Sequence, residues 1–559
     1  LGELGYNATH PNHPYRVYMP NGPDQTEMNP QVLEKFNKRL QLLKDSKLYA
    51  MPLNLNVGTA PPAWLTKDKT LSESGGHFIP YSLESEPMKQ VLDNYYRMII
   101  TQANKWDNVA GYLLYNEPTY EGKTEAFEQA YHEWLKEKYG TIDALNEEWM
   151  ESYASFDVVP CSKLVKSFAG RRDWADFNRL HFSNSVRYLH ELKDKYDTHN
   201  RPDNVKLLSK PLYSSEAWFI GNDWQEVSEI TDIIGYDASS EYEPMMTDFM
   251  WSMAPNKPMM NGEYHVSWKP EDGPWATTWQ TAAHGLDAFV YWEWKSPDKV
   301  PEGREAPSIQ PYSFSRLTRA ANDIQRLAPE LYTLSEQPRE IAILYSMNAI
   351  AFDPKPFFES MRGSYAGLIG HGEPVRFLME RQLRAGALEE GTIKLLIVPT
   401  IQHADPDIVE AIIEFADAGG TIVAVGESFL YDSAGRELPA DLQSWTDADN
   451  IYSIGLKDAE WTDPAMRQRW FADVIATSDV DAPAQVVDAE GNPILGLDVI
   501  ADRDSKLLVV VPMKPFSEPV TATILWDNQP ASGVDLISNE PIDSTLELQL
   551  FEPYLIQLD

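Results

Sequence analysis

Strand-like apolar runs alternate with helical patterns up to about residue 330, and this alternation constrains the fold more than any other feature of the chain. Each run is short, apolar and followed by polar or turn-forming residues, as expected of a buried strand. The runs are "YAMPLNLNV" (49–57), "VAGYLLY" (109–115), "VKLLS" (205–209), "DIIGYD" (232–237), "KPMMNGE" (257–263) and "LDAFVYWEW" (286–294). The segment "YNATH" (6–10) adds a seventh strand.

Amphipathic helices are expected between these strands. In "PQVLEKFNKRLQLLKDS", the residues Val32, Leu33, Phe36, Leu40 and Leu43 share one helical face. Further helices are predicted over 87–105, 124–139 and 174–196. Strand–helix alternation of this length is typical of parallel strands with helical crossovers, in a barrel or an open sheet. Seven strands would leave an eight-stranded barrel without its first strand, so we expect upstream sequence to be missing from this chain.

Two further regions follow the barrel-like part. The runs "REIAILYS" (339–346), "KLLIVPT" (394–400) and "GGTIVAVG" (419–426) predict a smaller doubly wound, flavodoxin-like α/β domain. After about residue 455 the runs alternate or become short and turn-bounded, which predicts a terminal β-sandwich. The expected division is a catalytic barrel in 1–335, an α/β domain in 336–455 and a β-sandwich in 456–559.

Charge and cysteine content exclude several functions. The chain carries 47 basic and 85 acidic residues, a formal net charge of −38, which disfavours nucleic acid and anionic membranes as partners. The sequence contains no run of about 18 apolar residues, so no membrane span is predicted. The single cysteine, Cys161, excludes an internal disulfide and a cysteine-cluster zinc site. No signal peptide is visible, which favours a cytoplasmic location.

The stretch "GYLLYNEPTY" (111–120) is an apolar run that ends abruptly in Asn116, Glu117 and Pro118. In a (β/α) barrel, catalytic groups lie at the carboxyl ends of strands, and Pro118 cannot continue the ladder. Glu263 ends the run "KPMMNGE" in the same way. Two strand-end carboxylates are what retaining glycoside hydrolysis needs, one as acid and base and one as nucleophile, about 5 Å apart.

This pattern has plainer explanations. The chain has 85 acidic residues, and a glutamate at a strand end is more often a helix cap or a surface group. Asn-Glu-Pro alone is a three-residue signal. The 17 Trp and 27 Tyr suit a sugar site, because aromatic faces pack on pyranose rings, but most of them are expected in the core.

Longer motifs sharpen the interpretation. The loop "GTAPPAWLTK" (58–67), the segment "EQAYHEWLKEKYGTIDALNEEW" (128–149) and the segment "NGEYHVSWKP" (261–270) resemble, in the same order, segments of the family 42 β-galactosidases. "WADFNRLHFSN" (174–184) and "QTAAHGLDAFVYWEWKSP" (280–297) also resemble that family. The resemblance implies a (β/α)8 TIM barrel of the clan of retaining glycosidases, followed by an amidotransferase-like trimerisation domain.

The resemblance also implies roles for individual residues. Glu117 would be the acid/base, Glu263 the nucleophile, and Asn116 the partner of the sugar 2-hydroxyl. Trp268 would stack on the sugar. Tyr264 and His265 flank the nucleophile, and Trp64 lies in a loop that could reach the same mouth; for Tyr264 and Trp64, structural roles remain open. The expected enzyme is a retaining exo-β-glycosidase acting on oligosaccharides, with no cofactor and no metal, and it would be a homotrimer.

The chain departs from the family pattern at several positions. It has Asn-Glu-Pro where the family has Asn-Glu-Tyr, and Glu293 where the family's last strand carries Arg, which makes Glu293 a candidate substrate contact. These departures leave the sugar open, so a β-mannosidase or a hydrolase of algal-polysaccharide oligosaccharides is an alternative. A carbohydrate-binding protein without catalysis, or a structural subunit with an inactive barrel, are alternatives from other classes.

Overall fold

The computed structural model describes most of the chain. The described residues are 6–11, 15–54, 62–68, 70–71, 81–117, 124–161, 170–211, 223–238, 243–265, 273–292, 311–516 and 518–559. The chain divides into two compact units. Unit 1 comprises Leu1–Ala238, Asn256–Tyr264 and Ala288–Val290, and unit 2 comprises Ser239–Pro255, His265–Asp287 and Tyr291–Asp559.

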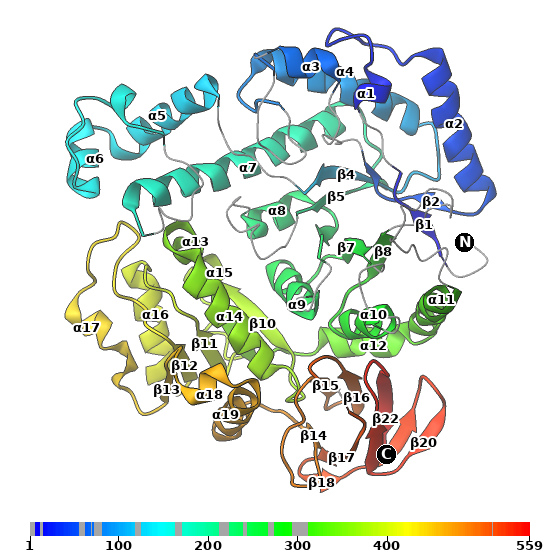
Figure 1. Ribbon diagram of the computed structural model, residues 1–559, viewed down its shortest axis with the longest axis vertical. Coiled ribbons are helices and arrows are strands. Elements are labelled where there is room, and N and C mark those ends of the chain that lie inside the picture. Colours follow the sequence, from blue (N-terminus) through cyan, green and yellow to red (C-terminus); the bar gives the residue numbers. More distant parts are fainter. Residues whose placement is uncertain are drawn as a thin grey trace. The chain divides into compact units, whose positions relative to one another are not determined.

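Parallel strands that follow one another in the sequence form the centre of unit 1 (Figure 1). They are β1 (Ala8–Thr9), β2 (Tyr49–Ala50), β3 (Leu53–Asn54), β4 (Gly111–Asn116), β5 (Lys206–Lys210), β6 (Ile234–Tyr236), β7 (Met259–His265) and β8 (Ala288–Trp292). The neighbours are β1-β2, β3-β4-β5 and β6-β7-β8. Parallel bridges from Ala50 to Val109 and from Leu208 to Ile233 join these groups in sequence order. This is the strand order of a (β/α) barrel wall, and each predicted run supplies a strand.

The helices of unit 1 lie outside these strands (Figure 1). The long ones are α2 (Pro30–Asp45), α4 (Glu86–Ala103), α5 (Glu125–Tyr139) and α7 (Arg172–Thr198), which confirms the predicted helices to within a few residues. Their starts follow from local sequence: side chains of Asn29, Ser85 and Thr124 accept backbone N–H bonds at the first turn. The shorter helices are α1 (Tyr15–Tyr18), α3 (Ala63–Lys67), α6 (Ile142–Trp149), α8 (Trp224–Ile230) and the 3₁₀ turn η2 (Phe156–Val158).

Two apolar clusters hold unit 1 together. A large one lies between strands and helices and contains, for example, Phe36, Tyr95, Tyr112 and Leu192. A small one draws residues from successive strands, as expected inside a barrel. Its members are Leu113, Leu208, Ile233 and Met260, with Met51, Ala288 and Val290 packed against them.

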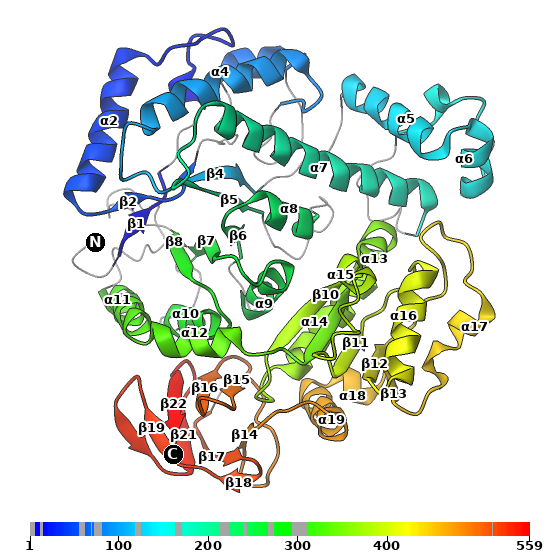
Figure 2. The same cartoon turned by 180° about the vertical axis from the view of Figure 1, so that it is seen from behind.

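Unit 2 contains a five-stranded sheet in which all neighbours are parallel (Figure 2). The strand order is β10 (Val375–Met379), β9 (Ile341–Tyr345), β11 (Leu395–Val398), β12 (Thr421–Val425) and β13 (Ile451–Ile454). β9, β11 and β12 are buried along their whole length, as their continuous apolar runs predict. The main connecting helices are α14 (Pro354–Leu368) and α16 (Pro406–Asp417), with α13 (Met347–Phe352), α15 (Glu380–Arg384), α17 (Ala440–Gln443) and η8 (Trp445–Asp447).

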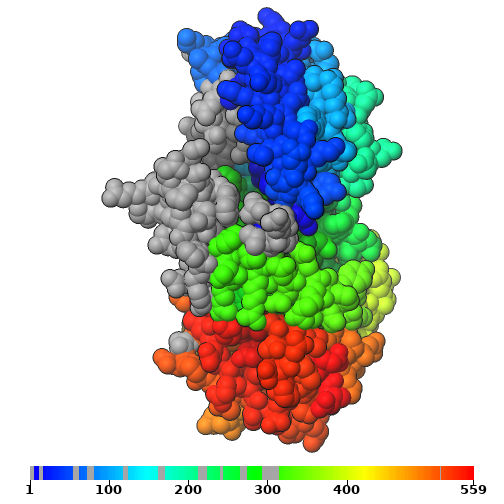
Figure 3. All heavy atoms as spheres, turned by 90° about the vertical axis from the view of Figure 1, so that its right-hand side faces the viewer, coloured from blue at the N-terminus to red at the C-terminus, as the bar shows by residue number. Residues whose placement is uncertain are grey.

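From Ala484 on, the described residues form nine antiparallel strands in two sheets. One contains β14 (Ala484–Val487), β17 (Val520–Trp526), β18 (Gln529–Pro530) and β21 (Thr545–Leu548). The other contains β15 (Leu497–Asp502), β16 (Leu507–Pro512), β22 (Tyr554–Leu558), β19 (Gly533–Asp535) and β20 (Glu540–Ile542). Inner residues of both sheets share one core, including Val486, Val499, Ile524 and Ile556. Strands β18 and β20 are among the more exposed ones. Figure 3 shows the C-terminal residues as an orange and red surface.

The change to β-structure begins later than the sequence predicted. Residues 459–477 form helices α18 (Ala459–Thr462) and α19 (Pro464–Thr477), and the strands begin at Ala484. Asp463 caps α19 by accepting the N–H groups of Ala465 and Met466. Pro464 suits the first helical position because its missing N–H would have no partner there. The expectation of strands directly after residue 455 was therefore wrong for this segment.

Unit 2 also includes helices that the sequence analysis assigned to the barrel domain. They are α9 (Glu243–Met253), α10 (Gly273–Ala283), α11 (Pro311–Arg326) and α12 (Ala328–Glu336). A buried charge cluster ties α9 and the residue directly after α10 to later residues: His284 donates to Asp248 (2.8 Å) and Asp498 (2.9 Å), and Arg339 donates to Asp248 (2.5 Å). The contacts of unit 2 thus cross residue 335, and the boundaries of the three predicted domains stay predictions. Across the described residues, no helix combines the length and the apolar character needed to cross a membrane.

Candidate active site

Glu117 lies directly after β4, where the sequence placed it. Its side chain is buried, and its N–H donates to the carbonyl oxygen of Lys210 (2.8 Å) at the end of β5. Its backbone has φ +46°, a left-handed conformation that non-glycine residues rarely adopt. Such backbone geometry persists only where the surroundings enforce it, and it is concentrated at functional sites.

A β-bulge in β4 precedes Glu117. The pairing with β5 shifts register between Leu113 and Tyr115. Leu113 belongs to the small inner cluster, whereas both Leu114 and Tyr115 pack in the large cluster on the helix side. The hydroxyl of Tyr196 in α7 donates to the carbonyl of Leu113 (3.0 Å), which satisfies a backbone group at the irregularity. The bulge breaks the alternation of side chains and so changes the direction in which the strand end points.

Glu263 lies on β7 and is also buried. Its backbone N–H donates to the Oδ1 atom of Asn261 (3.0 Å), and the amide of Asn261 donates to the carbonyl of Ala238 (3.0 Å). Asn261 therefore connects β7 with the residues that follow β6. These bonds fix the backbone at the position from which the carboxylate projects.

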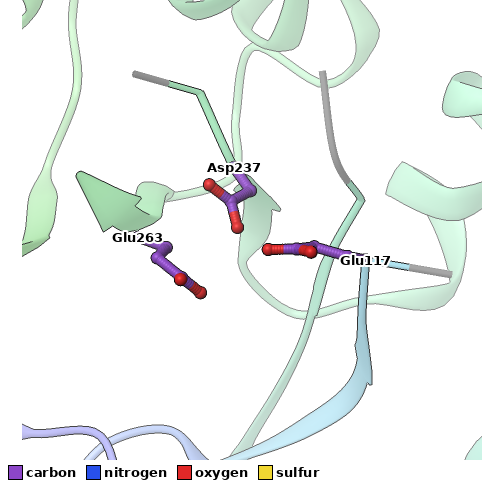
Figure 4. Close-up of side chains that lie close together, drawn as sticks. All are labelled: Glu117, Asp237 and Glu263. Atoms are coloured by element: carbon purple, nitrogen blue, oxygen red, sulfur yellow. The ribbon is translucent and has the colours of Figure 1, made fainter. Parts of the chain in front are cut away.

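A third carboxylate, that of Asp237, joins these two. Asp237 follows β6, is buried, and donates its N–H to the carbonyl of Pro211 (2.9 Å). Figure 4 shows the side chains of Glu117, Asp237 and Glu263 pointing toward one another. One carboxylate oxygen from each of the three lies within 4.8 Å of the others.

Lys210 supplies positive charge to this cluster. It ends β5, its side chain is fully buried, and its Nζ atom donates to the Oε2 atom of Glu263. The same Nζ lies 3.2 Å from the Oδ2 atom of Asp237. Three carboxylates at this spacing could hold a metal ion in other surroundings. Here the ammonium group already contacts two of them, and its charge would repel a second cation.

Burial and neighbouring charges shift the pKa values of Asp237 and Lys210. Burial raises the pKa of Asp237 well above its usual range; Lys210 opposes this, while a hydrogen bond with Glu117 and the charge of Glu263 add to it. The hydrogen bond between Asp237 and Glu117 therefore favours the protonated form of the Asp237 carboxyl group. Burial lowers the pKa of Lys210, but the charges of Asp237, Glu263 and Glu117 outweigh it and raise that pKa above its usual value. Lys210 therefore stays charged.

His10 follows β1 and faces the same charges. Burial lowers the pKa of His10 to about 3, the charge of Lys210 lowers it further, and the charge of Glu263 opposes both. The imidazole is therefore neutral at physiological pH. Within the described part of the chain, neither ring nitrogen of His10 has a hydrogen-bond partner.

Three other predicted residues are described. Asn116 is the last residue of β4, is buried, and pairs in register with Lys210. Tyr264 is fully buried, and its ring packs edge-to-face on Phe289 with centroids 6.2 Å apart. Trp64 packs against the large core and donates its indole N–H to the carbonyl of Met19 (2.8 Å). These contacts account for Tyr264 and Trp64 structurally, and substrate contacts of all three residues stay predictions.

Some predicted positions lie outside the described residues. These are Trp268, Glu293 and Pro118, together with the side chain of His265, whose backbone ends β7. Their predicted roles stay predictions.

Sequence reasoning missed Lys210, Asp237 and His10 as members of this cluster. A signal for two of them was present: Asp237 ends the run "DIIGYD", and Lys210 follows the run "VKLLS" directly. The carboxyl ends of neighbouring parallel strands meet at one edge, so every polar residue at such an end is a candidate. His10 carried the same signal at the end of "YNATH".

Solved structures share this fold. Gan42B, a family 42 β-galactosidase from G. stearothermophilus, aligns with a TM-score of 0.79 over 100% of this chain and 94% of its own, at 15% identity. An exo-carrageenase of family 42 from Bacteroides ovatus aligns with a TM-score of 0.77 over 99% of this chain and 82% of its own, at 19% identity. Identities this low establish the fold alone: a TIM-barrel catalytic domain with additional domains.

Sequence comparison gives the family. A β-galactosidase from Geobacillus kaustophilus is 23% identical over 460 residues, which are 72% of this chain and 65% of that protein. The chain spans about half to two thirds of the length of the first curated relatives that it matches. The sequence profile of the family 42 glycoside hydrolases, described as β-galactosidases, matches residues 34–333, more than half of the chain. The chain therefore belongs to the family 42 glycoside hydrolases.

Proposed function

We propose that the protein is a retaining exo-β-glycosidase that removes terminal β-galactosyl residues from oligosaccharides. The observation that carries the proposal is the spacing of Glu117 and Glu263, whose nearest carboxylate oxygens lie within 4.8 Å. Carboxyl groups about 5 Å apart suit a retaining mechanism, whereas an inverting mechanism needs roughly 6.5 to 9.5 Å to admit water. Family membership and the β-galactosidase relatives favour galactose over mannose or an algal-polysaccharide fragment.

In the first step, a carboxylate oxygen of Glu263 attacks the anomeric carbon. The bond from that carbon to the glycosidic oxygen breaks, and the proton of Glu117 passes to the leaving oxygen. Asp237 is hydrogen-bonded to Glu117, and burial raises the pKa of Asp237, so a carboxyl group that favours its protonated form lies beside the proposed acid. The amide of Asn116 would hydrogen-bond the sugar 2-hydroxyl, and Trp268 would stack on the sugar face.

In the second step, a water molecule attacks the anomeric carbon of the glycosyl-enzyme. Glu117 takes a proton from this water, the new carbon–oxygen bond forms, and the ester bond to Glu263 breaks. The sugar leaves with the configuration that it had in the substrate. Both carboxylates then return to their starting protonation states.

We also propose that the parallel sheet of unit 2 is a flavodoxin-like, amidotransferase-like module that assembles a trimer. Its strand order, β10-β9-β11-β12-β13, is the doubly wound order 2-1-3-4-5. Amidotransferase chemistry needs a reactive cysteine, and the only one, Cys161, is in unit 1, where burial raises its pKa to about 12. The module is thus a fold reused without its chemistry. The two antiparallel sheets after Ala484 would form the β-sandwich domain.

The proposal is tested with 4-nitrophenyl β-galactoside, β-mannoside, β-glucoside and β-fucoside, beside a Glu117→Gln/Glu263→Gln control. Release from the galactoside, lost in the control, is the expected result. Release from the mannoside alone would correct the sugar and keep the mechanism. No release from any glycoside or from galacto-oligosaccharides, with retained sugar binding by calorimetry, would instead support a carbohydrate-binding protein without catalysis.

A further inference from the structure

We propose that Lys210 is a positioning residue that holds Glu117 and Glu263 in place and stabilises the ionised form of each carboxylate when it must act. The inference rests on the proposed function, because it assigns roles within that reaction. Three independent features of the structure support it: the contacts of Lys210 with both glutamates, the packing of its stem on β7, and its place among the charges.

Lys210 contacts the two glutamates through different groups. Its carbonyl oxygen accepts the N–H of Glu117 (2.8 Å), and this bond fixes the strained backbone from which the Glu117 side chain projects. Its Nζ atom donates to Oε2 of Glu263. Since both groups belong to one residue at the end of β5, a displacement of Lys210 would move the anchors of both carboxylates together.

The sequence of β7 makes room for Lys210. A Cβ atom on Gly262 would lie 2.3 Å from Cδ and 2.8 Å from Cγ of Lys210, closer than Cβ atoms approach other atoms. Only glycine lets the lysine stem cross β7 here and bring its ammonium group to Glu263. The glycine in "NGE" therefore has a structural reason that involves the candidate nucleophile directly.

The charges around Lys210 define what its ammonium group can do. It faces Glu117 after β4, Asp237 after β6, Glu263 on β7 and the neutral His10 after β1. Before the first step, the ammonium favours the ionised Glu263 that must attack. Once Glu263 is esterified its charge is gone, and the same ammonium favours the ionised Glu117 that must accept a proton from water. One fixed cation thus serves both steps.

The first test is the pH dependence of kcat/KM with 4-nitrophenyl β-galactoside in Lys210→Met, Lys210→Arg and the parent. Without the cation, both carboxyl groups hold their protons more tightly, so both limbs of the profile should move to higher pH, by about 1 to 3 units. Lys210→Arg should move them less, because it keeps the charge. If Lys210→Met lowered the maximum of kcat/KM but left both limbs at the same pH, the proposal would be overturned, because the lysine would then have a purely structural role.

Lys138→Met is the matched control. Lys138 also pairs with a buried carboxylate of unit 1, that of Asp176 (2.5 Å), but on helices α5 and α7. Its loss should lower thermal stability and leave the limbs of the pH profile where they are. A shift equal to that of Lys210→Met would show that any lost lysine moves the profile, and would overturn the assignment to Lys210.

A second test needs no turnover. Thermal unfolding is measured for the parent, Lys210→Met, Glu263→Gln and the double variant. The Lys210→Met change should lower the unfolding temperature clearly in the parent background and much less with Glu263→Gln, because the pair is already broken. Equal effects in both backgrounds would overturn the proposal, even if no glycoside is cleaved.

Coupling between the two substitutions, in a protein that cleaves no glycoside, would leave Lys210 as the anchor of Glu263 and refute only the proposed function. If Lys210→Met does not fold, Lys210→Gln, which also removes the charge, carries both tests.

Discussion

Gly262 and Lys210 pack so closely that a single methyl group at position 262 would lie 2.3 Å from Cδ of the lysine. Lys210 cannot swing aside, because it is fully buried and its ammonium group is paired with Glu263 and Asp237. We therefore expect Gly262→Ala to lower the free energy of unfolding by about 1 to 3 kcal/mol, the usual cost of overpacking. It should also reduce kcat, since relief of the clash displaces the ammonium group. Denaturant unfolding and steady-state kinetics measure the two effects.

The control for Gly262→Ala removes the lysine stem. In a Lys210→Ala background, the atoms that clash are absent, so Gly262→Ala should then have little further effect on stability. Additive effects of the two substitutions would mean that the methyl group meets some other obstacle, and the packing argument would be wrong.

Glu117→Gln should affect substrates according to their leaving groups. The amide cannot donate a proton, so kcat/KM for a galactoside with an alkyl leaving group should fall about 100- to 10,000-fold. A 2,4-dinitrophenyl leaving group departs without protonation, and its first step should change far less. Hydrolysis rates with both substrates give the comparison.

Glu128→Gln serves as the control, because Glu128 is an exposed carboxylate on α5. It should leave both rates unchanged. An equal loss on both substrates in Glu117→Gln would argue against Glu117 as the acid and toward a role in holding the site together.

The proximity of the two glutamates could be predicted from sequence, because each ends an apolar run and parallel strands bring such ends together. The other cluster members end strands as well, but the sequence does not give their side-chain directions. Those directions depend on the bulge in β4, where Leu114 and Tyr115 pack on the same side, and on the room that Gly262 leaves for Lys210. Both are tertiary features: one is a register shift between strands, and the other is a contact between residues 52 positions apart.

The fold was predictable where a segment carries its own pattern. The helices of unit 1 and the parallel strands of both units follow from apolar spacing and capping residues. The pattern failed around α19, where a β-rich tail made the whole region look like strands although Asp463 and Pro464 mark a helix start. The pattern also could not show that Asp248 and His284 share a buried cluster with Asp498, because Asp498 lies more than 200 residues after both of them.

Trp64→Phe separates a structural role of Trp64 from a role in sugar binding. The substitution removes the hydrogen bond to the Met19 carbonyl but keeps an aromatic ring in the core. We expect a loss of about 0.5 to 1.5 kcal/mol in the free energy of unfolding and an unchanged KM for 4-nitrophenyl β-galactoside. Trp106→Phe is the matched control, since its indole N–H donates to Asn37 (3.3 Å) in the same unit. A tenfold rise in KM in Trp64→Phe alone would place Trp64 at the sugar.

His284 should make unit 2 sensitive to alkaline pH. Burial lowers the pKa of His284, but the charges of Asp248 and Asp498 and their hydrogen bonds outweigh it and raise that pKa to about 10. The folded protein therefore holds a proton that the unfolded chain releases near pH 6.5. The resulting stabilisation is complete below about pH 6.5 and is lost as pH rises toward 10.

The free energy of unfolding of unit 2 should accordingly fall by up to about 1.4 kcal/mol per pH unit between pH 7 and 9. Denaturant unfolding at pH 7, 8 and 9 gives the slope, and His284→Gln should flatten it. His371→Gln is the control: His371 is buried in the same unit, but burial lowers its pKa to about 4, so it titrates on the acid side and should leave the alkaline slope unchanged. A slope that survives in His284→Gln would mean that other groups release the proton, and that the cluster holds His284 in its neutral form.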